Sequence, residues 1–215
     1  QAEDGIRDLV RSRGLGDVYK RQHIFRFNNA LEEIKRLIDD GFFGRLFAIE
    51  FVWKNKEPVF NDRDVLIDLA PHIFDMLNYL TDSWPDSVFC SGKPFRREKG
   101  DEMAYLVVTH ENGPMAFANM SWLVPKKERA VTIIGENRTA WVNVLSQEVI
   151  VHESGYHFNL AIERNNTIRD ELIHFIEAAH DPVKETRNSG QVGQRTVELI
   201  EKAYESVETG KPVSC

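Results

Sequence analysis

The chain lacks several features that would place it in a specialised class of protein. It has two cysteines in 215 residues, Cys90 and Cys215, and they lie far apart. This excludes a disulfide-stapled secreted domain and indicates free thiols in a reducing cytoplasm. No run approaches the roughly 20 consecutive apolar residues of a membrane span. Acidic residues outnumber basic ones, 34 to 27, and the formal net charge is −7, so nucleic acid and anionic membrane surfaces are not expected as partners.

A dinucleotide-binding signature is also missing. No strand is followed by Gly-x-Gly-x-x-Gly and a helix, so the sequence predicts that a Rossmann domain is absent from this chain. Apolar residues make up 42% of the chain and aromatic residues 10%, which is enough for a sizeable core and excludes disorder over most of the length.

The first 22 residues differ in character from the rest. They begin with Gln1 rather than Met and show no sustained apolar period. Written back as DNA, residues 1–22 resemble a sequencing-library adaptor. We therefore interpret them as a non-native segment, take residues 23–215 as one domain, and expect an upstream portion of the natural protein to be lost.

Apolar periodicity and turn residues predict the order of the elements from His23 onward. The first part of the chain is predicted to hold a short strand, a helix capped by Asn28 or Asn29, a second strand, a loop and a second helix. Their ranges are 23–27, 30–40, 45–53, 54–64 and 65–80.

Five strand-like runs and two closing helices follow. The runs are separated by turn residues, and the last of them can be a hairpin; they cover 87–91, 103–110, 115–123, 129–135 and 138–152. The helices cover 167–179 and 189–209, with Gly210 as C-cap. This order predicts an α+β fold with one mostly antiparallel open sheet and helices packed on one face.

The second predicted helix carries a polar line on an otherwise apolar segment. Asp68, His72 and Asp75 recur at i, i+4 and i+7. Pro71 is tolerated in the first turn of a helix, which would place His72 close to the helix N-terminus. There the helix dipole favours a neutral imidazole, as a general base requires.

A structural interpretation of the same residues stays open. Asp68 can be an N-cap and His72 a half-buried histidine with a satisfied hydrogen bond. A metal site needs three or four ligands, and the Asp68–His72 spacing supplies two, so no metal is expected.

The order and spacing of several short motifs resemble a known family. The motifs run over residues 25–28, 41–44, 68–75, 171–176, 189–193 and 206–213, and they include Gly41-x-x-Gly44 and Asp68-x-x-x-His72-x-x-Asp75. Together they resemble the C-terminal domain of the glucose-fructose oxidoreductase, inositol dehydrogenase and rhizopine catabolism (Gfo/Idh/MocA) family. The resemblance covers essentially all of residues 23–213.

The resemblance implies the substrate-binding half of an NAD- or NADP-dependent oxidoreductase. In the family, the histidine that matches His72 is the acid/base on the hydroxyl being oxidised, and the aspartate that matches Asp68 assists or orients it. The cofactor domain and its catalytic lysine have no counterpart here. The fragment itself is therefore expected to be inactive and to bind the cofactor poorly.

A cluster of cations narrows the class of sugar substrate that we expect. Lys126, Lys127 and Arg129, after Ser121-Trp122, resemble the subgroup that acts on nucleotide sugars, where they could meet a diphosphate. A solvated loop is the alternative for this run. Arg26 is a weaker candidate for substrate contact, with packing or a salt bridge as its alternative.

These observations predict a cytoplasmic sugar dehydrogenase that binds a small-molecule sugar. The alternatives are an inositol or polyol dehydrogenase domain and a non-catalytic sugar-binding or regulatory relative. In the family the open sheet face commonly packs against another subunit. The resemblance therefore implies a homo-oligomer, with Val107, Phe117 and Ile133 as residues that could face the partner.

Overall fold

Alternating apolar residues build one large sheet at the centre of the molecule. The structure, a computed structural model, describes residues 23–180, 187 and 189–215. Within them the sheet has nine strands in the order β8-β7-β6-β5-β1-β4-β3-β2-β9. Their bounds are β1 Leu46–Lys56, β2 Ser87–Lys93, β3 Met103–Thr109, β4 Met115–Ser121, β5 Leu123–Gly135, β6 Thr139–Asn143, β7 Glu148–Glu153, β8 Tyr156–Leu160 and β9 Val213–Ser214.

The central strand β1 sets the topology of the sheet. It pairs in parallel with β4 and antiparallel with β5, and the other neighbouring strands are antiparallel. A parallel pair needs a crossover connection, and the chain between β1 and β4 includes a long helix, α4 (Val65–Thr81). The mostly antiparallel α+β sheet predicted from the sequence is confirmed.

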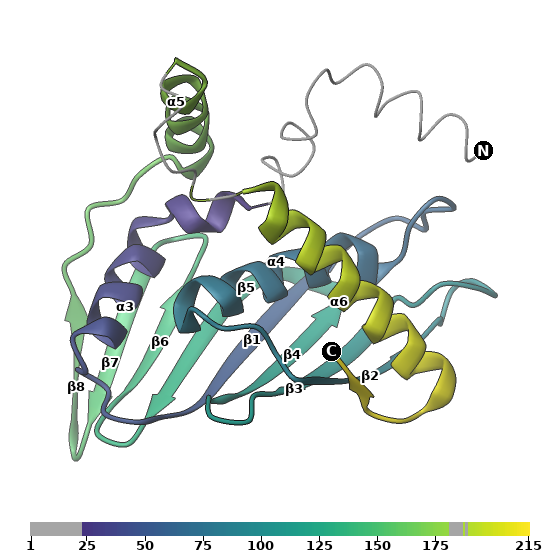
Figure 1. The fold of residues 1–215 in the computed structure, drawn as a ribbon, viewed down its shortest axis with the longest axis horizontal. Coiled ribbons are helices and arrows are strands. Elements are labelled where there is room, and N and C mark those ends of the chain that lie inside the picture. Colours follow the sequence, from purple (N-terminus) through teal and green to yellow (C-terminus); the bar gives the residue numbers. More distant parts are fainter. Residues whose placement is uncertain (1–22, 181–186, 188) are drawn as a thin grey trace.

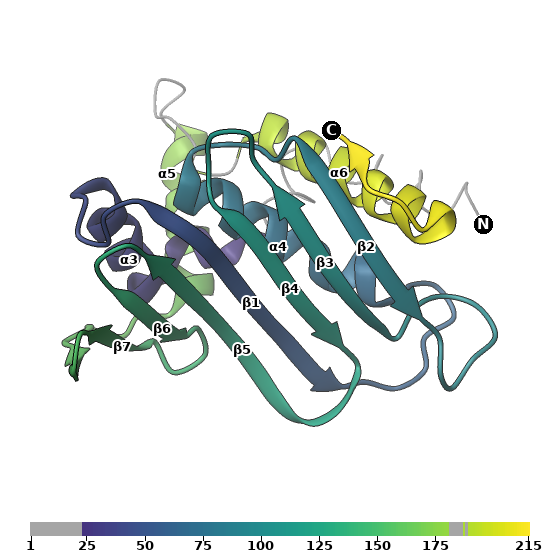
Figure 2. The ribbon, with the colours of Figure 1, turned by 90° about the horizontal axis from the view of Figure 1, so that it is seen from below.

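Helices cover one face of the sheet and leave the other open. The helices α3 (Asn29–Asp39), α4 and α6 (Gly190–Thr209) lie on the covered face, whereas α5 (Thr167–His180) extends away from it (Figure 1). Seen from below, β1 to β5 have no helix in front of them (Figure 2). Trp53, Trp122 and Phe74 are among the fully buried residues of the core between the layers. No helix of the described ranges is long and apolar enough to cross a membrane.

The predicted strand over 23–27 is wrong. Ile24–Phe27 is a short 3-10 helix, η1, in which the Arg26 N–H donates to the His23 carbonyl and the Asn28 N–H to the Phe25 carbonyl. Apolar alternation over so few residues does not separate a strand from a tight helical turn. Asn28 then caps α3, because its side chain accepts from the Ala30 and Leu31 N–H groups.

Pro71 is not in the first turn of its helix, and that prediction needs correction. Asp64 is the N-cap of α4, accepting from the Leu66 and Ile67 N–H groups, so Pro71 lies inside the helix. Because Pro71 has no N–H, the carbonyl of Ile67, four residues earlier, receives no helical hydrogen bond. Ile67 is an exposed residue. His72 therefore lies beyond the first turn, where the helix dipole has little effect on its charge.

Several strand boundaries differ from the sequence prediction. The predicted runs 115–123 and 129–135 become β4, which ends at Ser121, and a much longer β5 that contains the cation cluster. The predicted hairpin over 138–152 is confirmed as β6 and β7. The strand β8 was missed; it follows a two-residue turn in which Gly155 has a φ of +86°.

The uncovered face carries several large apolar side chains. Tyr105 and Phe117 are 51% and 37% exposed, and Val107 pairs with Phe117 across β3 and β4. Ile133, predicted for this face, is instead fully buried on the helix-covered side. The register explains the difference, since Ile133 pairs with the buried Ile49 of β1.

Candidate functional site

A cleft of about 500 Å³ gathers several residues singled out from the sequence. His72 of α4 and Lys127 and Arg129 of β5 line it, together with aromatic and apolar side chains of η1 and β1. A larger hollow of about 670 Å³ beside α3 is lined mainly by charged residues of both signs and contains no histidine. The cleft at His72 is therefore the better candidate for chemistry.

Aromatic rings hold one side of the His72 imidazole. The Phe25 ring meets it edge-on, with centroids 5.3 Å apart and planes at 86°. Phe25 in turn packs edge-on against Trp53, at 5.2 Å and 89°. Because η1 and β1 fix these rings, His72 is held at the cleft wall while its side chain remains partly exposed.

Asp68 lies one helical turn before His72 on the same side of α4. Its carboxylate accepts a hydrogen bond of 3.1 Å from the indole N–H of Trp122, a fully buried side chain. Asp68 also acts electrostatically on Arg129, because its negative charge raises the pKa of that guanidinium. Asp68 is thus oriented by a rigid neighbour, and a role for it beside His72 stays a prediction.

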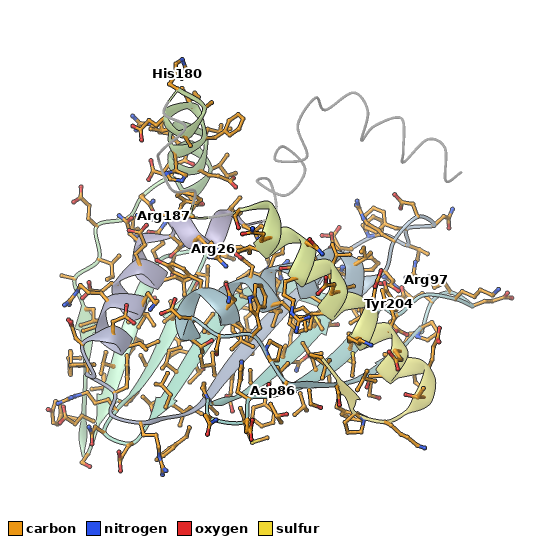
Figure 3. The ribbon with its side chains drawn as sticks, viewed as in Figure 1. Arg26, Asp86, Arg97, His180, Arg187 and Tyr204 are labelled. Carbon is orange, nitrogen blue, oxygen red and sulfur yellow. The ribbon has the colours of Figure 1, made fainter. Side chains whose placement is uncertain are left out.

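Asp75, the third member of the polar line, belongs to a separate buried cluster. Its Oδ1 accepts from Nε of Arg26 at 2.6 Å and lies 2.9 Å from Nδ1 of His23. Arg26 also donates to Oδ1 of Asn78 at 2.7 Å, and the labelled side chain lies between η1 and the helix layer (Figure 3). Arg26 is nearly buried and does not line the cleft, so this geometry favours the salt-bridge alternative for it.

Arg129 is a buried cation on the floor of the cleft. Its guanidinium donates to the Lys54 carbonyl at 3.0 Å and to Oδ1 of Asn55 at 2.8 Å, and it lies over the Trp53 ring at 5.2 Å. Burial lowers the pKa of Arg129 to about 10, while the negative charges of Asp68 and Glu57 oppose that shift. The group therefore keeps its positive charge at neutral pH.

Strand alternation separates the three predicted cations. Lys127 and Arg129 are two residues apart in β5 and both line the cleft. Lys126 directly precedes Lys127 in β5, so its side chain points to the opposite face of the sheet. It is exposed, as Lys127 is, but it does not line the cleft. The structure thus brings together His72, Lys127 and Arg129, and leaves Lys126 outside.

Amide side chains of the cleft were missed in the sequence. Gln147 donates from Nε2 to the Asn165 carbonyl at 2.9 Å, and the Asn165 N–H donates back to Oε1 of Gln147 at 3.2 Å. Gln147 has a φ of +54°, which is unusual for a residue other than glycine. The pairing joins residues 18 apart, and no local spacing in the sequence signals it.

The described residues offer no metal site and no cradle for a dinucleotide. No group of three or more His, Cys, Asp and Glu side chains within the described ranges could hold a metal ion. The cleft offers an apolar wall, two cations and amides, but no glycine-rich loop ahead of a helix N-terminus. A nicotinamide dinucleotide therefore does not fit these residues alone.

Known proteins share this fold. Among the curated proteins, the D-apiose dehydrogenase of Rhizobium rhizogenes is 21% identical over 223 aligned positions, which are 88% of this chain and 62% of that protein. The chain thus spans less than two thirds of the length of that relative.

Solved structures give the same picture. The UDP-N-acetylglucosamine 3-dehydrogenase of Acidithiobacillus ferrooxidans matches with a TM-score of 0.76 and 23% identity over 87% of this chain and 60% of its own. An Agrobacterium radiobacter oxidoreductase in complex with NAD+, L-tartaric acid and magnesium matches with a TM-score of 0.76 and 20% identity, over 89% and 63%.

A family model covers the core of the domain. The model of the GFO/IDH/MocA C-terminal domain matches residues 31–141, which run from α3 through β6 and include α4 and β5 with the cleft residues. On this match and the shared fold, the chain belongs to the Gfo/Idh/MocA family, as a C-terminal domain of that family.

Proposed function

We propose that this chain is the substrate-binding part of an NAD(P)-dependent oxidoreductase that oxidises a hydroxyl group of a sugar. The convergence of His72, Lys127 and Arg129 on one cleft is the observation that carries the proposal. The similar proteins include two sugar dehydrogenases and one oxidoreductase bound to NAD+. The cofactor would be held by a part of the enzyme outside this chain.

The acid/base role falls to His72. A nicotinamide ring, when bound, accepts the hydride from the carbon that carries the reacting hydroxyl. Removing the hydroxyl proton at the same time avoids a positively charged carbonyl intermediate, and a placed base contributes on the order of 10²–10⁴ in rate. His72 can take that proton because its ring lies in the cleft wall, fixed by Phe25.

A nucleotide sugar is the substrate class that the charges favour. Lys127 and Arg129 place two cations on one side of the cleft. Lys127 is exposed, whereas Arg129 is buried, and a buried cation is stabilised by an anionic partner. The Arg129 guanidinium already donates to the Lys54 carbonyl and to the side-chain amide of Asn55. Neither of these acceptors carries a charge. The diphosphate of a nucleotide sugar would add a directly bound anion to the negative charges of Asp68 and Glu57, which already act on Arg129.

A free polyol is the second candidate substrate. The amide side chains of Asn28, Gln147 and Asn165 also line the cleft, and amides hydrogen-bond hydroxyl groups without needing a charge on the ligand. The two candidates differ in how much they depend on Lys127.

Lys127→Gln and Lys126→Gln separate these candidates as a matched pair. Binding of UDP-N-acetylglucosamine and of inositol to the whole chain can be followed by calorimetry or by tryptophan fluorescence, since Trp53 is in the cleft wall. We expect Lys127→Gln to weaken nucleotide-sugar binding about 10-fold, as loss of one charged contact does, and Lys126→Gln to change it less than twofold. Inositol binding that exceeds nucleotide-sugar binding and ignores both substitutions would favour the polyol. Absence of saturable binding of either compound would contradict the proposal.

A further inference from the structure

Trp122 was singled out in the sequence, and the proposed function leaves it without a role. It lies between β4 and β5 and is fully buried. Its backbone N–H donates to the Glu102 carbonyl at 2.9 Å, and its own carbonyl accepts from the Glu57 N–H at 3.0 Å. These partners belong to the loops over 94–102 and 57–64, so both loops hold the backbone of Trp122.

The same two loops hold its ring. The Phe60 ring meets the indole at a centroid distance of 5.3 Å and an angle of 69°, and the Arg97 guanidinium lies 5.6 Å from the centre of the indole. Arg97 also donates to the Arg63 carbonyl at 2.9 Å and to the Gly100 carbonyl at 2.8 Å, which ties one loop to the other. A large ring packed in this way is held in one orientation.

The indole N–H of Trp122 meets the carboxylate of Asp68 on α4. It donates to Oδ2 at 3.1 Å, and the two residues are 54 apart in the sequence. Among the described residues no other group donates a hydrogen bond to this carboxylate, so Oδ1 keeps its lone pairs for another partner. Trp122 therefore fixes the carboxylate through one oxygen and leaves the other available.

Arg129 competes for the same carboxylate. It lines the cleft together with His72, and the negative charge of Asp68 acts on its guanidinium. Without the indole contact, the carboxylate would turn toward this permanent cation and away from an imidazole that is charged only after it has taken a proton. The hydrogen bond from Trp122 opposes that rotation.

We propose that Trp122 is a positioning residue, which holds the Asp68 carboxylate beside His72 against the attraction of Arg129. The inference rests on the proposed function, because His72 needs a nearby negative charge only if it acts as the base. When the imidazole takes the hydroxyl proton it becomes positively charged, and a carboxylate fixed one helical turn away stabilises that charge. Trp122 acts through Asp68 and touches no substrate.

A double-mutant cycle tests this coupling without any sugar. The pH midpoint of the His72 ring is measured by nuclear magnetic resonance in the whole chain as wild type, Trp122→Phe, Asp68→Asn and the double variant. Asp68→Asn should lower the midpoint by about half a pH unit, the effect of one charge about 6 Å away in water-like surroundings. Trp122→Phe should lower it by at least half as much, and should have no effect once Asp68→Asn is present.

Charged neighbours and loss of an indole are controlled in the same experiment. Lys127 and Arg129 are the charged side chains that line the cleft with His72, and all four proteins keep them. Trp141→Phe removes an indole from a partly exposed position of β6 and should leave the midpoint unchanged. An unchanged midpoint in Trp122→Phe would overturn the proposal. So would a shift of equal size in both backgrounds, which would indicate a packing effect.

A second measurement leaves the buried ring in place. The chain has four tryptophans, and the indole N–H resonance of Trp122 should follow the protonation of Asp68 at acid pH. In Asp68→Asn this response should disappear, while the other three indole resonances keep their own pH dependence. If no indole resonance loses its response in Asp68→Asn, the hydrogen bond does not form in solution and the proposal fails.

Neither measurement needs a substrate, so the two proposals can fail separately. Saturable sugar binding by a chain whose cycle shows no coupling would keep the proposed function and remove the role of Trp122. Coupling between Trp122 and Asp68 in a chain that binds no sugar would remove the proposed function and keep Trp122 as the residue that holds Asp68 at His72.

Discussion

At the scale of single residues, strand direction and burial decide which polar groups reach the cleft. The i, i+4 spacing of Asp68 and His72 was sufficient to place both on one side of a helix. The same reasoning failed for Asp75, because burial and the distant Arg26 turn it to another cluster. Long-range partners of this kind leave no trace in local spacing, and the Gln147–Asn165 pair is a second example.

The carboxyl of Asp101 gives a stability prediction that depends on pH. Burial and the negative charge of Asp64 raise the pKa of this carboxyl above its ordinary value of 3.8. A carboxyl whose pKa is raised by folding destabilises the folded state once it is ionised, and this cost grows as pH rises through the raised value. We expect Asp101→Asn to raise the thermal midpoint at neutral pH and to lose that advantage below about pH 3.8. Thermal melts of the variant and the wild type over a pH series measure this difference in midpoint. A difference that grows toward acid pH would contradict the raised pKa of Asp101.

At the scale of elements, apolar periodicity located the long helices and strands well. The predicted helix 30–40 and strand 45–53 correspond to α3 and β1. Both segments are long enough for the period of their apolar residues to be recognised. The segment 23–27 is too short for that and was misassigned. The predicted start of α4 at residue 65 is confirmed, but Asp64 is its N-cap, so Pro71 lies inside the helix rather than in its first turn.

Asp64 gives a prediction about the start of α4. Its Oδ1 accepts from the Leu66 and Ile67 N–H groups and from the Tyr204 hydroxyl of α6 at 2.6 Å. Asp64→Ala removes the cap and leaves that hydroxyl unpaired, so the free energy of unfolding should fall by about 1–2 kcal/mol. Asp64→Asn, which can still cap the helix, should lose clearly less. Urea denaturation measures both, and equal losses would show that the cap contributes little.

At the scale of the whole molecule, one covered and one open sheet face imply two kinds of neighbour. The family resemblance assigns the open face to a second copy of the chain, and the exposed Tyr105, Met115 and Phe117 on that face support self-association there as a proposal. The sequence could indicate that such a face exists from alternation, but not which side Ile133 takes, because the register with Ile49 fixes that side.

Phe117→Lys tests association through the open face. Phe117 lies on β4 between Val107 of β3 and Glu50 of β1, so a lysine there places a charge within the apolar area. We expect sedimentation to show an oligomer of the wild-type chain that Phe117→Lys converts to monomer, while Val197→Lys on α6 leaves it assembled. A monomeric wild-type chain at micromolar concentration, or an oligomer that survives Phe117→Lys, would place association elsewhere or exclude it.

The central claim is that the cleft beside His72 receives the sugar, and nuclear magnetic resonance of the histidine rings tests it most directly. The His72 imidazole, assigned with His72→Asn, is followed while UDP-N-acetylglucosamine is added to the whole chain, with His152 and His157 of the distant β7–β8 hairpin as internal controls. The account predicts a saturable shift of the His72 resonances and stationary His152 and His157 resonances. Binding that leaves His72 unmoved, or that shifts the hairpin histidines instead, would contradict it.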